Sequence, residues 1–586
     1  MTTHSQTFVL KLNNMKKISA LFILFLATIN YVGAVDYISA GSGEWTNTAT
    51  WSPNGSPGYN DNITIKAGHN ITLNQDVTVN SIIIEAGGKL EEDAIARRLI
   101  IKNTSTVYGV LISTNIEIGD SWAPGATGPL IIAPGGVVKV TGTLETYGNS
   151  NRLIIKTNPT TSGSLINSSE VAATIEFYIG GSANHLITPF FDGITANAYY
   201  DPNNDAWLSS HDESTNNWSY ITDLTAGLNK GQGYSYWPTN ATTLTFAGTL
   251  STSDVTKSIS NNGQAWNLLG NPFSSAIDWD NASWTHANST GTVYVYDNSH
   301  SGDNGYLTWN GTTGTLGNGI IPMGQGFFVK ANGTGNFTIP ADARIADNKK
   351  LYKSKNDTDP TMYVRFDLND SNVNRALFIG FPENGTDQFD FAGDADLLYS
   401  SSDKPEIYTI ENEKELCINA NTPLEEGETR TIPLYLVQII DGSYTLTLSD
   451  LDQLPDTKIT LEDLQTGTIQ NMNNNPVYTF TAYNGDEPNR FRVHFTSSPN
   501  AINESDAVNN DIQIYSYGKE VYIRSTNDAV HQNGIVYVYD LMGRKLTEKK
   551  IAGSNLVNFT VNTNNNYVVI KVVKESSVKT QKVFIK

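Results

Sequence analysis

Short runs of alternating apolar and polar residues recur along almost the whole chain, and they predict β-strands rather than helices. Between residues 36 and 166 these runs are only three or four residues long, as in residues 63–65, 82–84 and 99–101. Corners rich in Gly, Asn and Asp separate them. Short strands that each end in a turn are typical of the rungs of a parallel β-helix. We therefore expect a β-helix-like domain over residues 35–166.

Internal sequence similarity supports repeating coils in this region. Ile82-Ile-Ile-Glu-Ala-Gly-Gly88 matches Leu130-Ile-Ile-Ala-Pro-Gly-Gly136 at an offset of 48 residues. Leu99-Ile-Ile-Lys102 likewise matches Leu153-Ile-Ile-Lys156. The offsets are only approximately two rungs long, so we expect irregular coils.

A longer duplication lies in residues 167–345. In the first copy Asn184-His-Leu-Ile-Thr-Pro-Phe190 leads to Gly231-Gln-Gly-Tyr234, and in the second Trp266-Asn-Leu-Leu-Gly-Asn-Pro-Phe273 leads to Gly324-Gln-Gly-Phe327. The glycines fit a bulge or a close passage of two backbones. They do not fit a phosphate-binding loop, because neither a helix pattern nor Lys-Ser/Thr follows them. We expect two tandem β modules.

The strand patterns continue beyond the duplication and are interrupted once by a polar segment. Residues 346–498 predict a β-sandwich, with one helical turn around residues 451–454. Residues 499–510 are polar and poor in strand signals, and they predict a linker. Residues 511–586 hold about six or seven strand patterns, which predict a small sandwich. The expected fold class is therefore all-β, with a β-helix-like domain followed by several β-sandwich domains.

The last of these domains carries spaced motifs. An apolar strand pattern enters Asp-Leu-Met-Gly-Arg, where Gly543 supplies the positive φ that a tight turn needs. Together, Val536-Tyr-Val-Tyr-Asp-Leu-Met-Gly-Arg544, Tyr567-Val-Val-Ile-Lys571 and Lys582-Val-Phe-Ile-Lys586 resemble the type A C-terminal sorting domain of cargo of the Bacteroidetes type IX secretion system. Asn566 stands where that family more often has Gly. The residues that carry the resemblance are Tyr539, Asp540, Leu541, Gly543, Arg544, Tyr567, Lys582 and Lys586.

This resemblance implies a route and a destination for the protein. Cargo of this kind is exported across the outer membrane by the type IX machinery, usually loses the sorting domain and becomes attached to the cell surface. The tandem segment in turn resembles a module common in Bacteroidetes surface proteins, which has no firm biochemical role. We therefore expect a secreted protein or one on the outer cell surface, with the secretion machinery as a partner.

The N-terminus predicts the first step of that route. Met15-Lys-Lys17 precedes an apolar run at residues 21–27, and Val32-Gly-Ala34 offers small residues for cleavage. These features predict a signal peptide within residues 1–34, with Met15 as the true start. The apolar run is too short to anchor the chain in a bilayer. We expect no transmembrane helix in the mature protein.

Charge and cysteine content narrow the range of partners. The 586 residues carry a formal net charge of −21, which argues against nucleic acid or an anionic membrane as a partner. Charged residues make up only 17% of the chain while Gly, Asn, Thr and Tyr are abundant, and this profile favours a β-rich surface protein. Cys417 is the single cysteine, so no internal disulfide forms. We expect it to be a buried, small apolar side chain.

The sequence holds no strong catalytic motif. His-Glu-x-x-His, Gly-x-Ser-x-Gly and a phosphate loop are all absent, and the eight histidines are scattered. A β-helix can carry the carboxylates of a polysaccharide lyase or hydrolase on one face. The acidic residues in this region are Glu85, Glu91, Glu92, Asp93, Glu117 and Asp120. We expect them to form a solvated face instead.

Acidic loops offer a candidate ion site. Residues 297–304 place oxygen ligands at alternating positions, as calcium prefers, and the candidate ligands are Asp297, Ser299 and Asp303. No glutamate completes the loop at the right distance. Residues 201–205 and 389–396 group further carboxylates. Calcium is the one cofactor to consider, and the alternative is that these loops are ordinary turns.

Aromatic residues give the tandem modules a candidate ligand surface. Flat rings together with Asn and Asp side chains suit glycan binding, but most Trp and Tyr rings are buried in cores. We expect the strand aromatics to be core, and we take Trp207, Trp218 and Trp309, which we expect in loops, as candidate glycan contacts. We expect Trp45 and Trp51 to cap the first coil of the β-helix. The alternative for these two is a platform on which a sugar stacks.

Two classes of function remain open from the sequence. The first is an adhesin-like binding or structural component that contacts glycans or host and environmental surfaces without covalent chemistry. The second is a carbohydrate-active enzyme or glycan-binding accessory protein that uses the β-helix. Glycosidic cleavage needs two carboxyl groups at a controlled separation. An acidic cleft with paired carboxylates along the rungs would therefore favour the second class, and a smooth coil the first.

Overall fold

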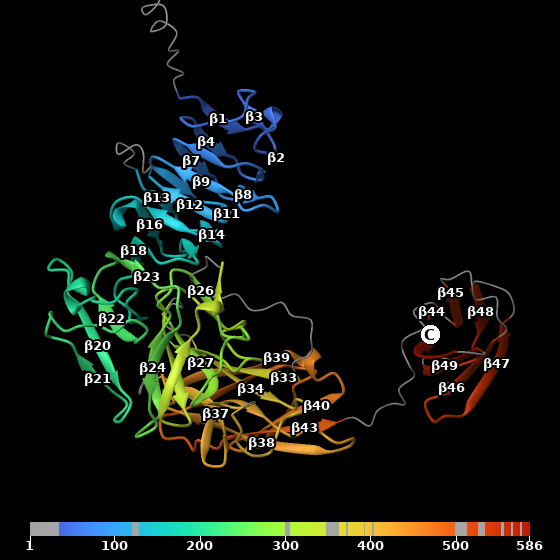
Figure 1. The fold of residues 1–586 in the computed structure, drawn as a ribbon. Coiled ribbons are helices and arrows are strands. Elements are labelled where there is room, and N and C mark those ends of the chain that lie inside the picture. The colour runs from blue at the N-terminus through green and yellow to red at the C-terminus, as the bar shows by residue number, and fades with distance from the viewer. Residues whose placement is uncertain are drawn as a thin grey trace, which may run out of the picture. The chain divides into compact units, whose positions relative to one another are not determined.

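The computed structural model describes residues 34–119, 128–298, 305–346, 362–370, 373–391, 393–400, 404–497, 512–517, 519–525, 534–551, 556–563, 566–574 and 577–585. It divides the chain into two compact units, Met1–Thr496 and Ser497–Lys586. Strands make up 54% of the structure and helices 3%, so the all-β prediction is confirmed (Figure 1). Across the described ranges, no helix is long and apolar enough to cross a membrane. The expected linker and all but the last residue of the expected signal peptide lie outside the described residues.

The first part of the larger unit is a solenoid with three sides of parallel strands, as the sequence predicts (Figure 1). The first side contains β1 (Asp36–Ser39), β4 (Asn62–Ile65), β7 (Ser81–Ile84), β10 (Ser105–Val107), β13 (Leu130–Ile132), β16 (Leu153–Lys156) and β18 (Val171–Ile179), with β3 (Trp51–Ser52) antiparallel to β1. The second contains β2 (Gly43–Glu44), β5 (Asn70–Leu73), β8 (Lys89–Glu92), β11 (Val110–Ser113), β14 (Val137–Val140) and β17 (Ser164–Ile166). The third contains β6 (Val77–Val79), β9 (Arg98–Ile101), β12 (Asn115–Ile118) and β15 (Leu144–Thr146).

Stacking in register explains why such short strands are sufficient. One buried apolar column runs through successive rungs and consists of Ile65, Ile84, Val107, Ile132, Ile155 and Ile175. At a corner, Asn103 Nδ2 donates to Asn80 Oδ1 and Asn80 Nδ2 donates to Asn62 Oδ1, each at 2.7 Å. Each rung therefore satisfies the polar and apolar groups of the next one, which is how solenoids distribute their stability.

The same stacking explains one sequence similarity and overturns the other. Ile82 on β7 and Leu130 on β13 lie two rungs apart on the first side, with β10 between them. Leu99 and Leu153, by contrast, lie on the third and first sides respectively, so the expected equivalence of their motifs is wrong. Both motifs have the same alternation of inward and outward residues, and alternation does not distinguish one side from another.

Trp45 and Trp51 close the first coil. Their rings are 0% and 2% exposed and their centroids lie 5.0 Å apart. Trp51 Nε1 donates to the Trp45 carbonyl at 2.8 Å, and Trp45 Nε1 donates to the Pro57 carbonyl at 3.2 Å. The cap prediction is confirmed, and the alternative of a sugar-stacking platform is wrong because the rings are covered.

Two copies of one six-strand module follow, in agreement with the duplication in the sequence. The first contains β18, β19 (His185–Ile187), β20 (Ala206–Asp212), β21 (Asn217–Tyr220), β22 (Tyr234–Pro238) and β23 (Thr242–Leu250); the second contains β24 (Val255–Ile259), β25 (Trp266–Gly270), β27 (Ser289–Asp297), β28 (Gly305–Trp309), β30 (Gly326–Ala331) and β31 (Gly335–Ile339). The central sheets run β19-β22-β20-β21 and β25-β30-β27-β28, and the remaining strands pair as β18-β23 and β24-β31. A small sheet of β29 (Ile320–Ile321), β26 (Ala276–Asp278) and β32 (Arg344–Ile345) belongs to the second copy. Because β18 also pairs with β16, the solenoid and the first copy share a strand.

Each Gly-Gln-Gly stands at the start of a strand, β22 in the first copy and β30 in the second. Its two glycines are required for different reasons. Gly231 and Gly324 have φ values of 76° and 71°, in the left-handed region that favours glycine. Gly233 passes close to the second copy, where an added Cβ would lie 2.5 Å from the Leu269 carbonyl oxygen. The predicted close passage of two backbones is thereby confirmed.

The larger unit ends in an 11-stranded sheet that encloses one hydrophobic core, and we call this region, residues 363–497, the sandwich. The strand order is β41-β40-β43-β38-β36-β37-β34-β33-β39-β42, with β35 attached to β37. The strands are β33 (Tyr363–Asn369), β34 (Asn374–Gly380), β35 (Ala395–Asp396), β36 (Glu406–Glu411), β37 (Lys414–Ala420), β38 (Thr429–Val437), β39 (Gly442–Ser449), β40 (Thr457–Asp463), β41 (Thr468–Asn471), β42 (Val477–Ala482) and β43 (Phe491–Ser497). The expected helical turn is a 3-10 helix, Leu451–Gln453.

The smaller unit contains two sheets, β44-β45-β48 and β47-β46-β49-β50, around a core of its own. The strands are β44 (Ile512–Tyr517), β45 (Glu520–Ser525), β46 (Gly534–Asp540), β47 (Lys545–Ile551), β48 (Leu556–Thr560), β49 (Asn566–Lys574) and β50 (Ser577–Ile585). The turn between β46 and β47 is the tight turn predicted from the sequence. Gly543 has a φ of 78°, and its N–H donates to the Asp540 carbonyl at 3.0 Å.

Candidate functional site

A groove lies on one face of the central sheet of the first copy. Residues directly opposite each other in antiparallel strands point to the same face. Trp207 on β20 is opposite Trp237 on β22, and Ser209 is opposite both Ser235 on β22 and Tyr220 on β21. These side chains therefore share a face, and they line a cavity of about 580 Å³.

Other parts of the larger unit supply the remaining walls of this groove. Tyr296 on β27 and Tyr306 on β28, both from the second copy, line it with ring centroids 5.3 Å apart. Ser400, in the segment before β36, lines it as well. The groove therefore forms only when two tandem copies and the sandwich are packed together.

Three aromatic rings of the groove are open to solvent. The exposed fractions are 46% for Trp207, 43% for Trp218 and 66% for Tyr220, whereas Leu208 and Tyr236 on the opposite face of the sheet are buried. The Trp207 and Tyr220 ring centroids are 5.2 Å apart. Exposed rings gathered in one concavity mark interaction sites, unlike single exposed apolar residues. Trp207 and Trp218 thus have the exposure expected of ligand contacts.

His211 holds the Trp218 ring in place. Its ring centroid is 5.1 Å from that of Trp218 and 4.9 Å from that of Phe328 of the second copy. His211 Nε2 lies 2.9 Å from Asn216 Oδ1. Burial lowers the pKa of His211, so the neutral ring donates to the Asn216 oxygen at pH 7. Trp218 is therefore supported from behind while its outer face stays open.

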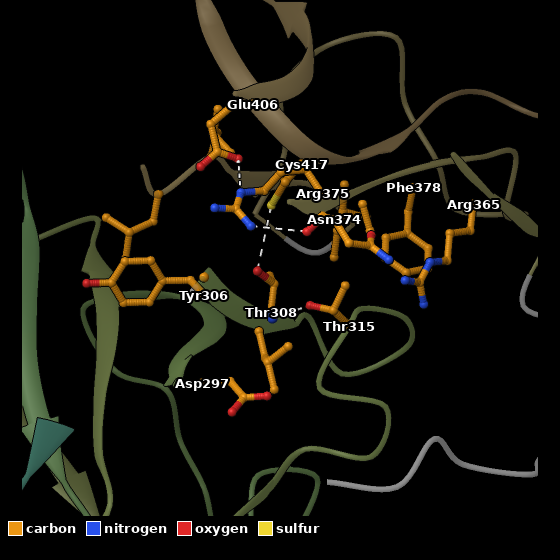
Figure 2. A pocket seen from close by; sticks show the side chains of 16 residues that line it. Asp297, Tyr306, Thr308, Thr315, Arg365, Asn374, Arg375, Phe378, Glu406 and Cys417 are labelled. Carbon is orange, nitrogen blue, oxygen red and sulfur yellow. Dashed lines mark hydrogen bonds and ion pairs between the residues drawn. The ribbon is translucent and has the colours of Figure 1, made fainter. Parts of the chain in front are cut away.

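A second cavity of about 300 Å³ lies between the second copy and the sandwich (Figure 2). Arg375 Nε is 3.0 Å from Glu406 Oε2, and Ser400 accepts from Arg375 at 2.9 Å and donates to Glu406 at 3.0 Å. Burial raises the pKa of Glu406, and Arg375 opposes that rise. Cys417 is buried as predicted, and burial raises its pKa to about 12, so the thiol stays protonated. The cavity lies between two parts of the fold, and the Cys417 side chain that lines it is a protonated thiol rather than a reactive thiolate.

Trp309, the third aromatic candidate, is buried. It is 4% exposed, and its Nε1 donates to Asp280 Oδ1 at 2.8 Å. It lies opposite Val293 and packs in the core of the second copy. The prediction of a ligand contact is wrong for this residue, because the pleat of β28 turns Trp309 toward the core and Tyr306 and Thr308 toward the other face.

The acidic residues of the solenoid are occupied by neighbours. Ion pairs join Glu91 to Lys89, Asp93 to Arg97 and Glu117 to Arg98. Glu92 accepts from Ser113 and Thr114, and Glu85 accepts from the Ala67 N–H. Asp120 lies outside the described residues. The prediction of one solvated face is wrong in part, because Glu91 and Glu92 lie on β8 of the second side and Glu117, 8% exposed, lies on β12 of the third.

Of the candidate calcium ligands, only Asp297, at the end of β27, lies within the described part of the chain. Ser299 and Asp303 lie outside it. Over the described residues, no group of three His, Cys, Asp or Glu side chains is placed to hold a metal ion. Calcium at this loop stays a prediction.

The residues that carry the sorting-domain resemblance lie at one turn and on the last two strands. Tyr539 and Asp540 end β46, and Leu541, Gly543 and Arg544 form the turn that follows. Asp540 Oδ1 accepts from the Arg544 N–H, and Arg544 Nε donates to Asp540 Oδ2 at 2.7 Å. On the last strands, Lys582 Nζ lies 4.5 Å from the centroid of the Tyr567 ring. Lys586 lies outside the described residues.

Sequence reasoning missed most of the groove. The signal that could have found it is spacing, because residues two apart on a strand share a face. Three such pairs line the groove, namely Trp207 with Ser209, Trp218 with Tyr220, and Ser235 with Trp237. Spacing alone does not say which of the two faces stays open, since that depends on packing between the copies.

Solved structures are similar to this chain only distantly. A β-glucuronidase from Ruminococcus gnavus in complex with D-glucaro-d-lactam aligns with 25% of this chain and 37% of its own length, at 12% identity and a TM-score of 0.09. The BSP domain of a biofilm-associated protein aligns over 73% of this chain and 96% of its own, at 9% identity and a TM-score of 0.11. The 47-kilodalton lipoprotein Tp47 of Treponema pallidum aligns over 65% and 86%, at 9% identity and a TM-score of 0.11. At these TM-scores the likenesses carry no argument, and no curated protein matches the chain.

A family model, by contrast, matches most of the chain. It is described as a domain of unknown function, DUF8693, and it covers residues 37–495. The match begins in the first strand of the solenoid and ends in the last strand of the sandwich. It therefore takes in the solenoid, both tandem copies and the sandwich as one arrangement. The chain belongs to the DUF8693 family.

Proposed function

We propose that this chain is an adhesin-like protein of the outer cell surface that binds carbohydrate in the groove of its first tandem copy. One observation carries the proposal: Trp207, Trp218 and Tyr220 are 46%, 43% and 66% exposed within one concavity. Sugar rings present apolar C–H faces edged by hydroxyl groups. Aromatic rings cover such faces, and neighbouring polar groups fix their orientation.

The export route of the proposal rests on the sequence motifs. Residues 511–586 resemble a type IX sorting domain, and the leader-like pattern within residues 1–34 fits the same route. The family match ends at residue 495, so the sorting-like region stands apart from the part of the chain that defines the family. We propose that this region directs export through the type IX machinery and that the rest of the chain performs the binding.

A glycan array with the purified protein tests carbohydrate binding. The variants Trp207→Ala, Trp218→Ala and Tyr220→Ala should each weaken binding about fivefold or more, because removal of an aromatic ring that contacts the ligand costs on the order of 1–3 kcal/mol. Tyr483→Ala is the matched control, since Tyr483 is 54% exposed on the sandwich and lies away from the groove. Binding that persists in all three groove variants would place the ligand elsewhere.

A reporter fusion tests the export route separately. A soluble reporter carrying residues 1–34 and 511–586 should reach the surface or the medium in a host with a type IX system. The matched control is the same fusion with residues 577–586 removed, which deletes edge strand β50 and the closing Lys582 motif. The proposal predicts that the control stays in the periplasm. Periplasmic retention of the complete fusion would contradict it.

A further inference from the structure

The groove is open because the first copy has serines where the second copy has aromatic rings. Ser235 pairs with Leu186 on one side and Ser209 on the other. At the equivalent place in the second copy, Phe328 pairs with Leu268 and Tyr294. Phe328 and Tyr294 are buried. The same sheet face is thus filled in one copy and hollow in the other.

The filled face of the second copy is covered by the sandwich. Tyr294 donates its hydroxyl to the Asp396 carbonyl at 2.9 Å, and Lys330 Nζ lies 2.5 Å from Asp396 Oδ1. Phe328 and Tyr294 belong to a core shared with strands of the sandwich. The first copy uses the equivalent face differently, since it keeps open rings around a floor of two hydroxyl groups.

The floor of the groove is ready to form hydrogen bonds. Ser209 and Ser235 both line the cavity, and among the described residues neither hydroxyl is engaged in a hydrogen bond. Trp207 and Trp237 form the neighbouring pair on the same two strands, and Tyr306 of the second copy lines the same cavity. A hydroxyl can act as both donor and acceptor, so it matches the hydroxyl groups of a sugar in either direction.

No formal charge lines this groove among the described residues. Tyr296 and Tyr306 stay protonated because burial raises the pKa of each phenol. Glu406, which accepts a hydrogen bond from the groove residue Ser400, is paired with Arg375. An anionic sugar would therefore lose its hydration without gaining a cation, and the chain's net charge of −21 would repel it.

We infer that the groove selects an uncharged glycan and holds a sugar ring between Trp207, Trp237 and Tyr306, with its hydroxyl groups on Ser209 and Ser235. The inference rests on the proposed carbohydrate binding and narrows it to one chemical class. Neutral oligosaccharides such as those of glucose, xylose or mannose fit this class. Uronic acid polymers and sulfated glycans do not.

Titration calorimetry of the full protein with matched oligosaccharides tests the inference. The neutral set is cello-, xylo- and mannohexaose, and the anionic set is hexagalacturonate and a heparin hexasaccharide, each at low and high salt. We expect binding to at least one neutral ligand with less than about a twofold change between the salt conditions, because no charge is screened. We expect no measurable binding of either anionic ligand.

Variants that copy the second module close the groove. Ser235→Phe and Ser209→Tyr should each weaken neutral binding at least about tenfold, because each ring fills the floor as it does in the second copy. Ser443→Phe, an exposed serine on β39, is the control for adding a ring to a strand. Ser235→Ala keeps the volume and removes only the hydroxyl, so it should weaken binding about two- to tenfold even if the larger variants fold poorly.

The outcomes separate the two proposals. Salt-sensitive binding of an anionic ligand in place of a neutral one would overturn this inference and leave carbohydrate binding standing. Failure to bind any saccharide on an array or by calorimetry would overturn the proposed function and the inference with it. Unchanged neutral binding in Ser235→Phe and Ser235→Ala would show that sugar binds outside this groove.

Discussion

Gln232 and Gln325 make the same hydrogen bond in opposite directions across the junction of the two tandem copies. Gln232 Nε2 of the first copy donates to the Leu268 carbonyl of the second at 2.6 Å, and Gln325 Nε2 of the second donates to the Leu186 carbonyl of the first at 3.1 Å. Backbone bonds repeat this exchange, from the Thr188 N–H to Gly324 and from the Gly270 N–H to Gly231. The duplicated Gly-Gln-Gly therefore joins the copies by a nearly two-fold contact.

Loss of either glutamine should loosen this junction to a similar extent. Gln232→Ala and Gln325→Ala should each lower the free energy of unfolding by about 1 kcal/mol, the net value of one hydrogen bond to a carbonyl. Gln388→Ala is the control, because Gln388 is exposed on the sandwich. Urea unfolding followed by tryptophan fluorescence measures the effect. A loss of stability in only one of the two variants would show that the two contacts are not equivalent.

The second glycine of the first motif should tolerate no side chain. Gly233→Ala would bring a Cβ to 2.5 Å from Leu268 Cγ and from the Leu269 carbonyl oxygen, and the overpacking should cost about 1–3 kcal/mol. Gly227→Ala is the matched control, because nothing lies within 4 Å of its added Cβ and its φ is not positive. Melting temperatures of the two variants give the comparison. Equal melting would rule out the close passage.

Removal of one partner from the buried ion pair of Arg490 and Asp463 should be strongly destabilising. The two side chains are 5% and 0% exposed, and Arg490 donates to both carboxylate oxygens at 3.0 and 2.8 Å. Burial alone would raise the pKa of Asp463, but Arg490 and the Tyr478 hydroxyl hold it below its usual value. Asp463→Ala leaves the buried guanidinium with only the more distant Asp486 carboxylate, at 3.9 Å, and should cost about 3–5 kcal/mol.

The control for this pair is a surface ion pair. Lys230 lies 2.7 Å from Asp192, whose side chain is 81% exposed, so Asp192→Ala should cost less than about 1 kcal/mol. Chemical unfolding of both variants measures the difference. An Asp463→Ala cost as small as that of Asp192→Ala would show that water reaches Arg490 and replaces the carboxylate.

His286 should make the second copy sensitive to acid. Its ring stacks on Trp284 at 5.6 Å and lies 4.5 Å from the Trp279 ring, and burial lowers its pKa to about 4. Between about pH 6.5 and 4 the unfolded chain therefore binds a proton that the folded chain does not. The contribution of neutral His286 to the free energy of unfolding is complete above about pH 6.5. It is lost as the pH falls through this range, by up to roughly 3 kcal/mol.

His286→Phe keeps an aromatic ring and removes the titration. The left-handed backbone at this position, with φ of 46°, is less favourable for Phe than for His, and this cost is the same at every pH and so cancels from the comparison. Asp394, whose pKa burial raises to about 6, titrates in the opposite sense, so the measured quantity is the difference between wild type and variant. Melting temperatures from pH 7 to pH 4 should diverge toward acid. Parallel curves would contradict a buried neutral His286.

Much of the architecture could be predicted because its signals are local. Two-residue alternation predicts strands, three-residue runs between Gly and Asn corners predict solenoid rungs, and Gly543 predicts the turn after Asp540. These features depend on backbone geometry and on neighbours within a few residues. The duplication was visible for the same reason, since each copy repeats its own strand order and its own Gly-Gln-Gly.

The groove was only half visible in the sequence. The sequence predicts Trp207, Trp218 and Trp309 as candidate glycan contacts in loops; the loop placement is wrong for all three, and Trp207 and Trp218 are exposed while Trp309 is buried. All three lie on strands whose two faces alternate, so their spacing alone cannot assign the face that is covered. The serines between the rings gave no signal by themselves, because a serine on a strand is ordinary until the sister copy shows a phenylalanine in its place.

The all-β class, the short rungs and the tight turn follow from the amino-acid sequence because each depends on residues close together in the chain, and the duplication follows from motifs that recur along it. Tertiary structure alone decided which sheet face became a groove. The sandwich covers the face of the second copy through Tyr294 and Phe328, and it leaves the face of the first copy open over Ser209 and Ser235. Burial depends on what packs against a strand, and that partner can be distant in the chain: Asp396, whose carbonyl accepts from Tyr294, lies 102 residues further on.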